Sequence, residues 1–433
     1  MPRFLNSRDA DFEARFAALL GMKREEAEDV DAAVAAIIAQ VRVQGDGALV
    51  DLTARFDGHD LPLRFSEAEI DAACAQVSDA DRAALDLAAA RIGDYHARQM
   101  PRDETWVDGA GAQLGWRWTP VQAAGLYVPG GLASYPSSVL MNAIPARVAG
   151  VERLMISCPT PGGVVNPLVL LAARIAGVDE IWRIGGAQAI AAMAYGTATL
   201  APVDKITGPG NAYVAAAKRR VFGRVGIDMI AGPSEILVIA DRDNDPDWIA
   251  LDLLSQAEHD QSAQAILITD DAAFGLAVAA AVERRLDRLE RRAIAAASWA
   301  QNGAVIVVRG LDEAAALSDR IAPEHLELCV ADPEALAQKV RHAGAIFLGP
   351  WTPEAIGDYV GGPNHVLPTA RSARFSSGLS VMDFVKRTTI ARMTPAALAA
   401  VGPAAERLAQ SEGLQAHGLS VRVRLDALNS RQG

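Results

Sequence analysis

The chain has 433 residues, of which 51% are hydrophobic and 22% are charged. A single hydrophobic core rarely grows beyond about 250 to 300 residues, so this length predicts at least two globular domains. The formal net charge of −12 opposes a surface for phosphate backbones, which excludes nucleic acid as the expected partner. Apolar runs fall short of the roughly 18 residues that span a bilayer, and the charged start lacks a signal-peptide core. We therefore expect a cytoplasmic protein without membrane contacts.

Two composition features receive structural interpretations. The cysteines Cys74, Cys158 and Cys329 are far apart and form no CxxC motif, so we expect three reduced thiols that pack as small core residues. The one basic cluster, Lys218-Arg219-Arg220, comes late in a helical pattern and is interpreted as charge at a helix C-terminus.

The first hundred residues and the remainder of the chain have different patterns. Apolar residues at spacings of three and four predict helices over 9–20, 25–43 and 66–100. From Val121 onward, short apolar runs end in glycine or proline and alternate with helical patterns such as 272–289. The predicted strands are 125–128, 154–158, 180–184, 205–207, 236–240, 265–269, 304–308, 326–330 and 345–348. This alternation predicts two successive α/β units with parallel sheets.

The last fifty residues hold a predicted helix over 395–410 and little else that could form an independent core. We expect them to pack on the rest of this chain or on a partner.

Donors for a metal ion are scattered along the second half. A helix predicted to start at Asp245-Pro carries Gln256 and His259 on one face near its C-terminal end. Such a pair alone is more often a surface pair than a metal site. Asp358 and His417 lie far downstream, and two imidazoles, a carboxylate and an amide oxygen would suit catalytic zinc with open positions. Spacing alone does not assemble this set.

An acid and a base stand side by side in Pro323-Glu-His-Leu-Glu-Leu328, just before a predicted strand. We expect this strand end to lie at an edge of the sheet that carries reactive groups. Histidine titrates near neutral pH, so His325 could accept an alcohol proton, and Glu324 could serve a second proton transfer. The alternative is a solvated pair without a catalytic role. Glu327 is interpreted as structural.

Three glycine-bearing turns follow predicted strands, at Gly130-Gly131, Gly185-Gly186 and 208–211. Backbone N–H groups in such turns, together with a helix N-terminus, can bind a pyrophosphate. The GxGxxG pattern is absent from the sequence, and the turns are equally compatible with tight connections. Any dinucleotide site is therefore expected to be atypical.

Eight segments, taken together, resemble the histidinol dehydrogenase family. In chain order between residues 125 and 417 they are GLYVPGG, IGGAQAIAAMAYGT, KITGPGNAYV, DMIAGPSE, QAEHD, PEHLEL, GDYVGGPNHVLPT and EGLQAH. The resemblance implies oxidation of L-histidinol to L-histidine through histidinaldehyde with two NAD, the last step of histidine biosynthesis. It also implies a homodimer with shared active sites.

The family fold is α/β, with two incomplete Rossmann-like doubly wound domains. For this chain the resemblance implies a helical arm at 1–23 and a first domain of 24–126 with 236–379. The second domain, on the NAD side, would be 127–235. A small C-terminal domain, 380–433, would reach the partner's active site.

The resemblance also assigns residues. One Zn²⁺ per subunit would be bound by Gln256, His259, Asp358 and His417. Glu324 and His325 would be the catalytic acid and base. Substrate contacts would be Ser234, Gln256, His259, His325, Asp358, His365, Glu412 and His417, with Glu412 and His417 from the other subunit. NAD contacts would be Tyr127, Gln188 and Asn211. Two alternatives are a paralogue that oxidises another small polar alcohol and a non-catalytic metal-binding protein.

Overall fold

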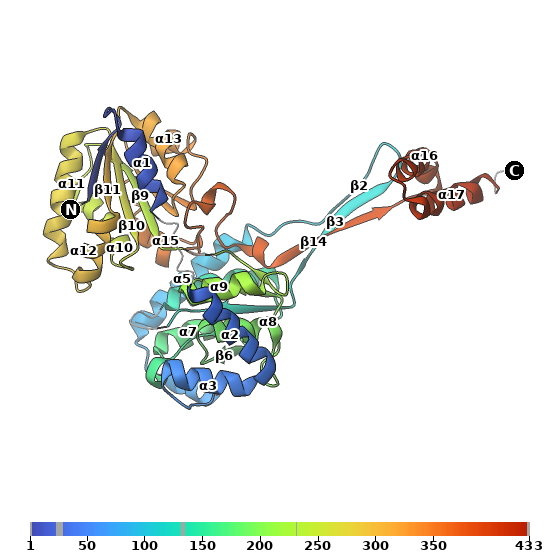
Figure 1. The fold of residues 1–433 in the computed structure, drawn as a ribbon, viewed down its shortest axis with the longest axis horizontal. Coiled ribbons are helices and arrows are strands. Elements are labelled where there is room, and N and C mark those ends of the chain that lie inside the picture. The colour runs from blue at the N-terminus through green and yellow to red at the C-terminus, as the bar shows by residue number, and fades with distance from the viewer. Residues whose placement is uncertain (1, 23–28, 131–134, 231, 431–433) are drawn as a thin grey trace. The chain divides into compact units, whose positions relative to one another are not determined.

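The computed structural model describes residues 2–22, 29–130, 135–230 and 232–430. The chain divides into two compact units, one of Met1–Gln99 with Val121–Phe384 and one of Met100–Pro120 with Val385–Gly433. The first unit contains two parallel sheets, and the second contains one antiparallel sheet and two helices (Figure 1). Among the helices in the described ranges, none is both long and apolar enough to cross a membrane.

A six-stranded parallel sheet forms one half of the first unit, in the order β1-β11-β10-β9-β12-β13. Its strands are β1 (Arg3–Asn6), β9 (Glu235–Ala240), β10 (Gln264–Thr269), β11 (Ala304–Val307), β12 (His325–Cys329) and β13 (Ala345–Leu348). Its helices are α1 (Phe12–Gly21), α10 (Pro246–Ala257), α11 (Ala272–Leu286), α12 (Arg292–Asn302), α13 (Leu311–Ile321), α14 (Pro333–Ala337) and α15 (Glu354–Tyr359). The side chains of β9 alternate between two apolar clusters, one shared with α10 to α12 and one with α1, α13 and α14. Helices therefore cover both faces of this sheet, as in doubly wound folds.

A five-stranded parallel sheet forms the other half, in the order β6-β5-β4-β7-β8. Its strands are β4 (Ala123–Tyr127), β5 (Arg153–Ser157), β6 (Glu180–Trp182), β7 (Lys205–Thr207) and β8 (Gly226–Ile227). The helices nearby are α2 (Asp29–Gln44), α3 (Asp46–Asp57), α4 (Glu67–Cys74), α5 (Asp79–Ala97), α6 (Pro136–Ala149), α7 (Pro167–Ile175), α8 (Gly186–Tyr195) and α9 (Ala212–Val221). Short 3₁₀ turns lie at Pro161–Gly163, Ser372–Arg374 and Val381–Asp383. The α/β class and the two predicted parallel arrays are confirmed.

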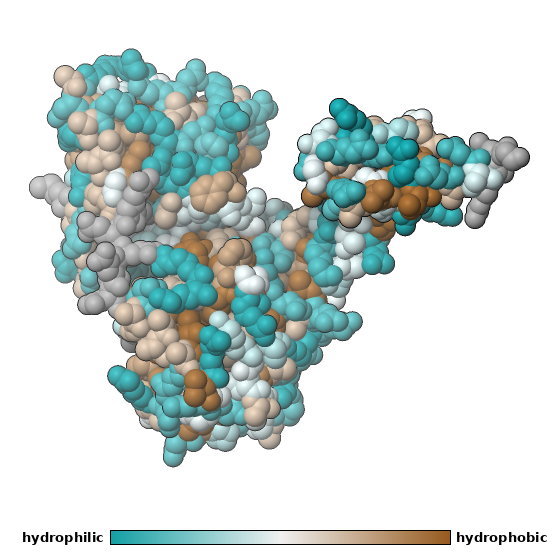
Figure 2. Space-filling view, turned by 45° about the vertical axis from the view of Figure 1, so that its right-hand side comes forward, coloured by the Kyte–Doolittle hydropathy of each residue, from teal (hydrophilic) through white to brown (hydrophobic). Residues whose placement is uncertain are grey.

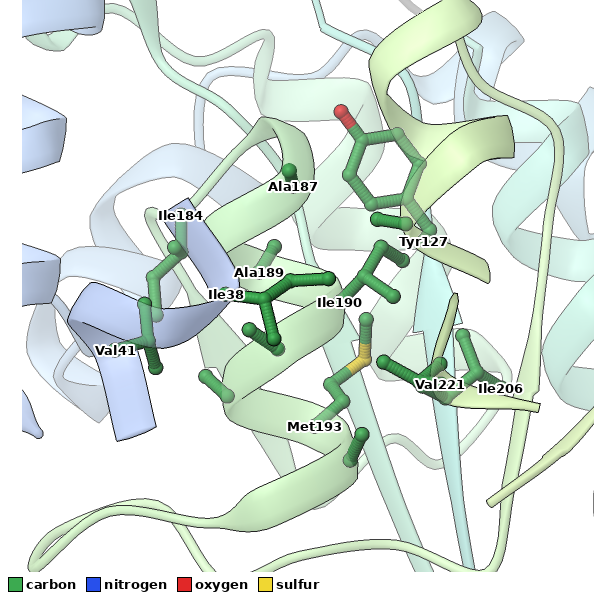
Figure 3. Packing of buried hydrophobic residues seen from close by; sticks show 14 of the residues in the cluster. Ile38, Val41, Tyr127, Ile184, Ala187, Ala189, Ile190, Met193, Ile206 and Val221 are labelled. Carbon is green, nitrogen blue, oxygen red and sulfur yellow. The ribbon is translucent and has the colours of Figure 1, made fainter. Parts of the chain in front are cut away.

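The core of this half is built around α8 (Figure 3). Ile190 and Met193 of α8 are fully buried and pack in one cluster with Ile38 of α2 and Ile206 of β7. Gly125 in β4 allows this approach, because a Cβ there would lie 2.4 Å from the Met193 sulfur.

The structure differs from the predicted helix over 66–100. It contains two helices, because Ser78 interrupts the pattern and caps α5 by accepting a hydrogen bond from the Asp81 backbone N–H at 3.1 Å. Ser66 begins α4 with a capping box in which Glu69 is the second member. Of the predicted helix 25–43, residues 25–28 lie outside the described ranges, and α2 runs from Asp29 to Gln44.

The N-terminal segments are distributed differently from the predicted division into domains. The prediction assigns 24–126 to the sheet of 236–379, but α2 packs on α8 and α9 and β4 lies in the five-stranded sheet. The reason is the apolar face of α2, whose Val34 and Val41 are buried in the α8 cluster. The predicted helical arm at 1–23 begins instead with β1, which pairs with β11 and buries Leu5.

The second unit joins two distant segments. Its strands are β2 (Glu104–Val107), β3 (Gln113–Pro120) and β14 (Val385–Arg392), and its helices are α16 (Pro395–Ser411) and α17 (Gln415–Asn429). Antiparallel pairing of β14 with β3 along its whole length adds 100–120 to the predicted tail of 380–433. The sequence pattern did not predict the helix α17. Apolar side chains of this helical pair remain exposed, among them Leu408, Leu414, Leu419 and Val423 (Figure 2).

Candidate active site

Most of the predicted catalytic and metal-binding residues in the first unit lie at the amino edge of the six-stranded sheet. His325 is the first residue of β12, and Glu324 precedes it. Gln256 lies in the last turn of α10, and Asp358 in the last turn of α15. Helices that connect parallel strands run opposite to them, so helix C-termini and strand starts meet at one edge. This edge is the opposite of the carboxyl edge at which open α/β sheets commonly bind ligands.

His325 is oriented by a backbone carbonyl. Its Nδ1 lies 3.0 Å from the Glu235 carbonyl oxygen, so we assign the Nδ1 hydrogen to this bond. Nε2 then carries the lone pair, is buried without a hydrogen-bond partner among the described residues, and lies 3.8 Å from Asp358 Oδ1. Burial lowers the pKa of His325 to about 4, against the opposing effect of Asp358. The ring is therefore neutral at pH 7, and Nε2 can accept a proton.

Glu324 is anchored beside this ring. Its Oε2 accepts a 2.9 Å hydrogen bond from the Glu235 backbone N–H and lies 3.7 Å from His325 Nδ1. Its own backbone carbonyl accepts a hydrogen bond from the Ala345 N–H. Gly344 is required next to it, since a Cβ at that position would lie 2.5 Å from the Glu324 carbonyl oxygen. Both members of the acid-base pair are thus buried and held by backbone groups.

Donors that suit a metal ion gather next to the pair. The predicted start of α10 is confirmed, because the Asp245 side chain caps the helix that carries Gln256. Gln256 is fully buried, its Nε2 lies 3.0 Å from His259 Nδ1, and its Oε1 has no partner within the described part of the chain. Burial lowers the pKa of His259, although Asp358 opposes this effect, so the ring is neutral and available as a ligand.

The donor chemistry fits zinc. An amide oxygen, an imidazole and a carboxylate from Gln256, His259 and Asp358 are ligand types that Zn²⁺ accepts, and the unpartnered Oε1 of Gln256 leaves a buried oxygen free for it. A further group at this edge could also hold a metal ion, because one donor atom each of His325, Glu354 and Asp358 lie within 4.8 Å of one another. Glu354 was not predicted from the sequence, although its position four residues before Asp358 puts both on one face of a helix.

His365 is held over the same edge. Its Nδ1 donates to the Asp358 carbonyl oxygen at 3.0 Å, and its Nε2 lies 3.1 Å from the Ser138 hydroxyl. The preceding Asn364 donates to the Met141 carbonyl oxygen at 2.6 Å and lies 3.3 Å from Nε2 of His96. These contacts fix the loop that carries His365 against α5 and α6.

Because His96 is fully buried and neutral, stability should depend on its protonation. Nδ1 faces the Gln99 side-chain oxygen at 2.7 Å, so Nε2 is the acceptor for Asn364, and burial lowers the pKa of the ring below 6.5. In the unfolded chain the ring binds a proton at a higher pH than in the folded chain. Protonation therefore favours the unfolded chain, and the stability that the neutral His96 contributes is lost as pH falls below about 6.5. We expect the melting temperature to fall less steeply between pH 7 and pH 5 in His96→Asn than in the wild type, by thermal scans at each pH. Equal slopes would contradict this role.

The predicted cofactor contacts lie at the carboxyl edge of the five-stranded sheet. Tyr127 ends β4 and its hydroxyl accepts a 3.1 Å hydrogen bond from the Gly186 N–H, while Gln188 is buried in the first turn of α8. Asn211 is exposed and caps α9 through its side-chain oxygen. The chain reverses its order between the adjacent strands β4 and β7, which is the usual dinucleotide crevice of such sheets.

The glycines in these turns are sterically required. Gly208 has φ +110°, and a Cβ there would lie 2.1 Å from the Tyr127 carbonyl oxygen. The first turn is described only to Gly130, because Gly131 and the rest of 131–134 lie outside the described residues. The helices α8 and α9 begin at this edge, and helix starts of this kind suit the pyrophosphate of a dinucleotide.

The basic cluster in α9 also supports this edge. The prediction of C-terminal helix charge is confirmed for the cluster, but Lys218 is buried and forms an ion pair with Asp228. Lys218 donates to the Gly208 carbonyl oxygen at 3.0 Å, and Asp228 accepts from the Gly208 N–H at 2.8 Å.

The prediction for the three cysteines is confirmed, since all are free and buried.

Three predicted substrate residues have less defined surroundings. Ser234 is half-buried just before β9, and its carbonyl oxygen accepts from the Gln264 N–H at 3.0 Å. In the motif that carries it, Ala231 is outside the described residues. Glu412 and His417 belong to the second unit, where Glu412 follows α16, His417 lies in the first turn of α17, and both are exposed.

Comparisons with known proteins point to one family along almost the whole chain. A family model described as histidinol dehydrogenase matches residues 21–425. The histidinol dehydrogenases of Cereibacter sphaeroides and Ruegeria pomeroyi are 78% and 75% identical over 432 residues, covering 99% of this chain and 100% of each relative. A crystal structure of histidinol dehydrogenase from Elizabethkingia anophelis has 38% identity and a TM-score of 0.95, and covers 99% of both chains. This chain therefore belongs to the histidinol dehydrogenase family.

Proposed function

We propose that this protein oxidises L-histidinol to L-histidine through histidinaldehyde with two NAD, as the last step of histidine biosynthesis. The observation that carries the proposal is the buried, neutral His325, whose free Nε2 faces Asp358 at 3.8 Å. Identities of 78% and 75% to histidinol dehydrogenases favour this substrate over another small polar alcohol. An alcohol dehydrogenase of this kind requires a base next to its metal donors and a cofactor that accepts the hydride.

For the metal, we propose that Gln256, His259 and Asp358, together with His417 of the partner subunit, hold one zinc ion. When bound, zinc would orient the substrate by its imidazole and amine nitrogens. Support comes from the unpartnered Oε1 of Gln256 and from the lowered pKa of His259. His365 and Ser234 would contact the substrate in the same subunit, and Glu412 would do so from the partner.

Each of the two oxidations has its own proton acceptor. In the first oxidation, Nε2 of His325 accepts the hydroxyl proton, and the bond from Nδ1 to the Glu235 carbonyl keeps the ring in the required tautomer. In the second, Glu324 takes a proton from the water that adds to the aldehyde. The bond from the Glu235 N–H to Oε2 holds this carboxylate in place.

NAD would accept both hydrides, with Tyr127, Gln188 and Asn211 among its contacts. The support is their position at the carboxyl edge of the five-stranded sheet, beside glycine turns that leave no room for side chains. The hydroxyl of Tyr127 is kept protonated, since burial raises its pKa to about 12.

A homodimer with shared sites accounts for the second unit. Its helical pair leaves Leu408, Leu414, Leu419 and Val423 exposed, although apolar side chains of this kind gain stability when covered. We therefore propose that this unit packs on a second copy and brings Glu412 and His417 to its site. We also propose a cytoplasmic location, in keeping with a role in histidine biosynthesis.

The test is the number of NADH molecules formed per molecule of limiting L-histidinol. We expect two with zinc-loaded protein, none after chelation, and recovery when zinc is restored. One NADH per substrate would reject the second oxidation. Activity that survives complete removal of metal would reject the zinc role, and turnover of another alcohol without turnover of histidinol would assign a different substrate.

A further inference from the structure

A buried ion pair joins Lys218 and Asp228 next to the glycine turn at 208–211, one of the turns at the proposed cofactor edge. Lys218 lies in α9, and Asp228 directly follows β8. Their side chains are 2% and 0% exposed, and Nζ of Lys218 contacts Oδ1 of Asp228. Arg219 and Arg220, the other members of the basic cluster, are exposed. Lys218 differs from both, because its charge is removed from water and paired inside the fold.

The ion pair holds both polar backbone groups of Gly208. Lys218 Nζ donates to the Gly208 carbonyl oxygen at 3.0 Å, and the Gly208 N–H donates to Asp228 Oδ2 at 2.8 Å. The Asp228 N–H in turn donates to the Ile206 carbonyl oxygen at 3.2 Å, next to the paired strands β7 and β8. Lys218, Asp228 and their two bonds to Gly208 are here called the clamp. The clamp fixes the turn both to the helix that follows it and to the next strand of the sheet.

The clamp affects the surroundings of two of the three proposed NAD contacts. Gly208 has φ +110° and lies so close to β4 that a Cβ there would be 2.1 Å from the Tyr127 carbonyl oxygen. Asn211, three residues further along, caps α9 through its side-chain oxygen. Lys218 lies about two turns into the same helix. A shift of Gly208 would therefore change both the backbone contact of Tyr127 and the start of the helix that Asn211 caps.

A gain in stability is a weak explanation for this ion pair. Two charges lose hydration when they are buried, and apolar side chains of similar volume commonly stabilise a fold as much or more. Charge-assisted bonds to a backbone N–H and a backbone carbonyl do something that apolar packing does not, because they fix distance and direction. The backbone fixed here is a turn at the carboxyl edge between β4 and β7, where the strand order reverses. This location favours a role in cofactor binding.

We propose that Lys218 and Asp228 are positioning residues for NAD, which hold Gly208 and so keep the turn at 208–211 in the shape that binds the cofactor. Both side chains are buried, so they act through the turn and not on the cofactor directly. The inference rests on the proposed function for the identity of the cofactor. It gives Lys218 a role beyond helix C-terminal charge, and it gives a role to Asp228, the first residue of the segment DMIAGPSE.

The test compares Lys218→Met, Asp228→Asn and the double variant in the full-length protein. Four quantities are measured: the Kd for NAD by calorimetry, zinc affinity by competition with a chelator, kcat and KM for histidinol oxidation, and melting temperature. Arg220→Met is the matched control, because it also removes a positive charge and an ion pair from α9, but the ion pair is an exposed one with Asp31. A loss of NAD affinity caused by net charge alone would be equal in Lys218→Met and Arg220→Met.

We expect Lys218→Met to raise the Kd and the KM for NAD by about 10- to 100-fold, the effect of losing one or two charge-assisted hydrogen bonds. Asp228→Asn should raise the Kd by about 10-fold, although removal of a negative charge would by itself favour an anionic ligand. Zinc affinity and kcat at saturating NAD should stay within about 3-fold of wild type, because the metal donors belong to the other sheet. Arg220→Met should bind NAD as the wild type does, since exposed ion pairs contribute little.

Several outcomes would overturn the proposal. These are an unchanged Kd for NAD in Lys218→Met, a lower Kd in Asp228→Asn, equal losses in Lys218→Met and Arg220→Met, or a loss of zinc affinity as large as the loss of NAD affinity. If a single variant does not fold because one charge stays buried alone, the uncharged double variant decides the question. It should bind NAD as weakly as expected for Lys218→Met, because the Gly208 carbonyl still lacks its donor. A wild-type protein that binds NAD but does not oxidise histidinol would instead reject the proposed function, and NAD binding would still test the clamp.

Discussion

Replacing His325 by alanine is expected to lower kcat for histidinol oxidation by about 10²- to 10⁴-fold, the usual contribution of a general base. Nε2 of this ring is the neutral, unpartnered acceptor beside Asp358, and alanine leaves no group to take the hydroxyl proton. The measurement is steady-state NADH formation at saturating histidinol. His342→Ala is the control, because His342 is a half-buried histidine outside the site. Unchanged histidinol oxidation in His325→Ala would reject His325 as the base.

The companion variant separates the two oxidations. Glu324→Gln keeps an oxygen that can accept from the Glu235 N–H, so it preserves the local bond while it removes the carboxylate. We expect it to spare oxidation of histidinol to the aldehyde more than oxidation of added histidinaldehyde, and His325→Ala to have its larger effect on the alcohol step. Equal damage to both steps in each variant would contradict this division.

Replacing His259 by alanine is expected to abolish stoichiometric zinc binding, and activity with it. His259 is the one imidazole among the proposed ligands of the first unit, and burial keeps it neutral for binding. We expect zinc affinity to fall by more than the roughly 10- to 100-fold that follows loss of a group that only orients a ligand.

Metal content after dialysis, together with chelator competition, measures this effect. Glu258→Gln is the matched control, because it changes the adjacent residue at the same helix end and leaves the imidazole in place. Full zinc occupancy in His259→Ala would remove this residue from the ligand set. Equal loss of zinc in the control would point to a general disturbance of the α10 terminus.

The parallel sheets were predictable because their signal is local. Strands such as β9 and β10 are buried on both faces and read as continuous apolar runs that end at turns. The antiparallel sheet has no such signal. The strand β14 is mostly exposed, and its partner β3 lies more than 260 residues earlier in the chain. The strand β1 has only four residues, so no periodicity could be recognised.

The site was predictable only in part from the residues themselves. Spacing brings Gln256 close to His259 and places Glu324 beside His325, but it does not bring α10, β12 and α15 together. The resemblance supplied the remaining assignments. Glu354 was missed because it comes close to His325 only after β12 and α15 have met in the folded chain.

The two parallel sheets use opposite ends of their helices, and this gives their edges opposite electrical polarity. At the amino edge of the six-stranded sheet, α10 and α15 present C-terminal carbonyls, the negative ends of their dipoles. At the carboxyl edge of the five-stranded sheet, α8 and α9 present N-terminal N–H groups, the positive ends. The backbone alone therefore favours a metal cation at one edge and a pyrophosphate at the other.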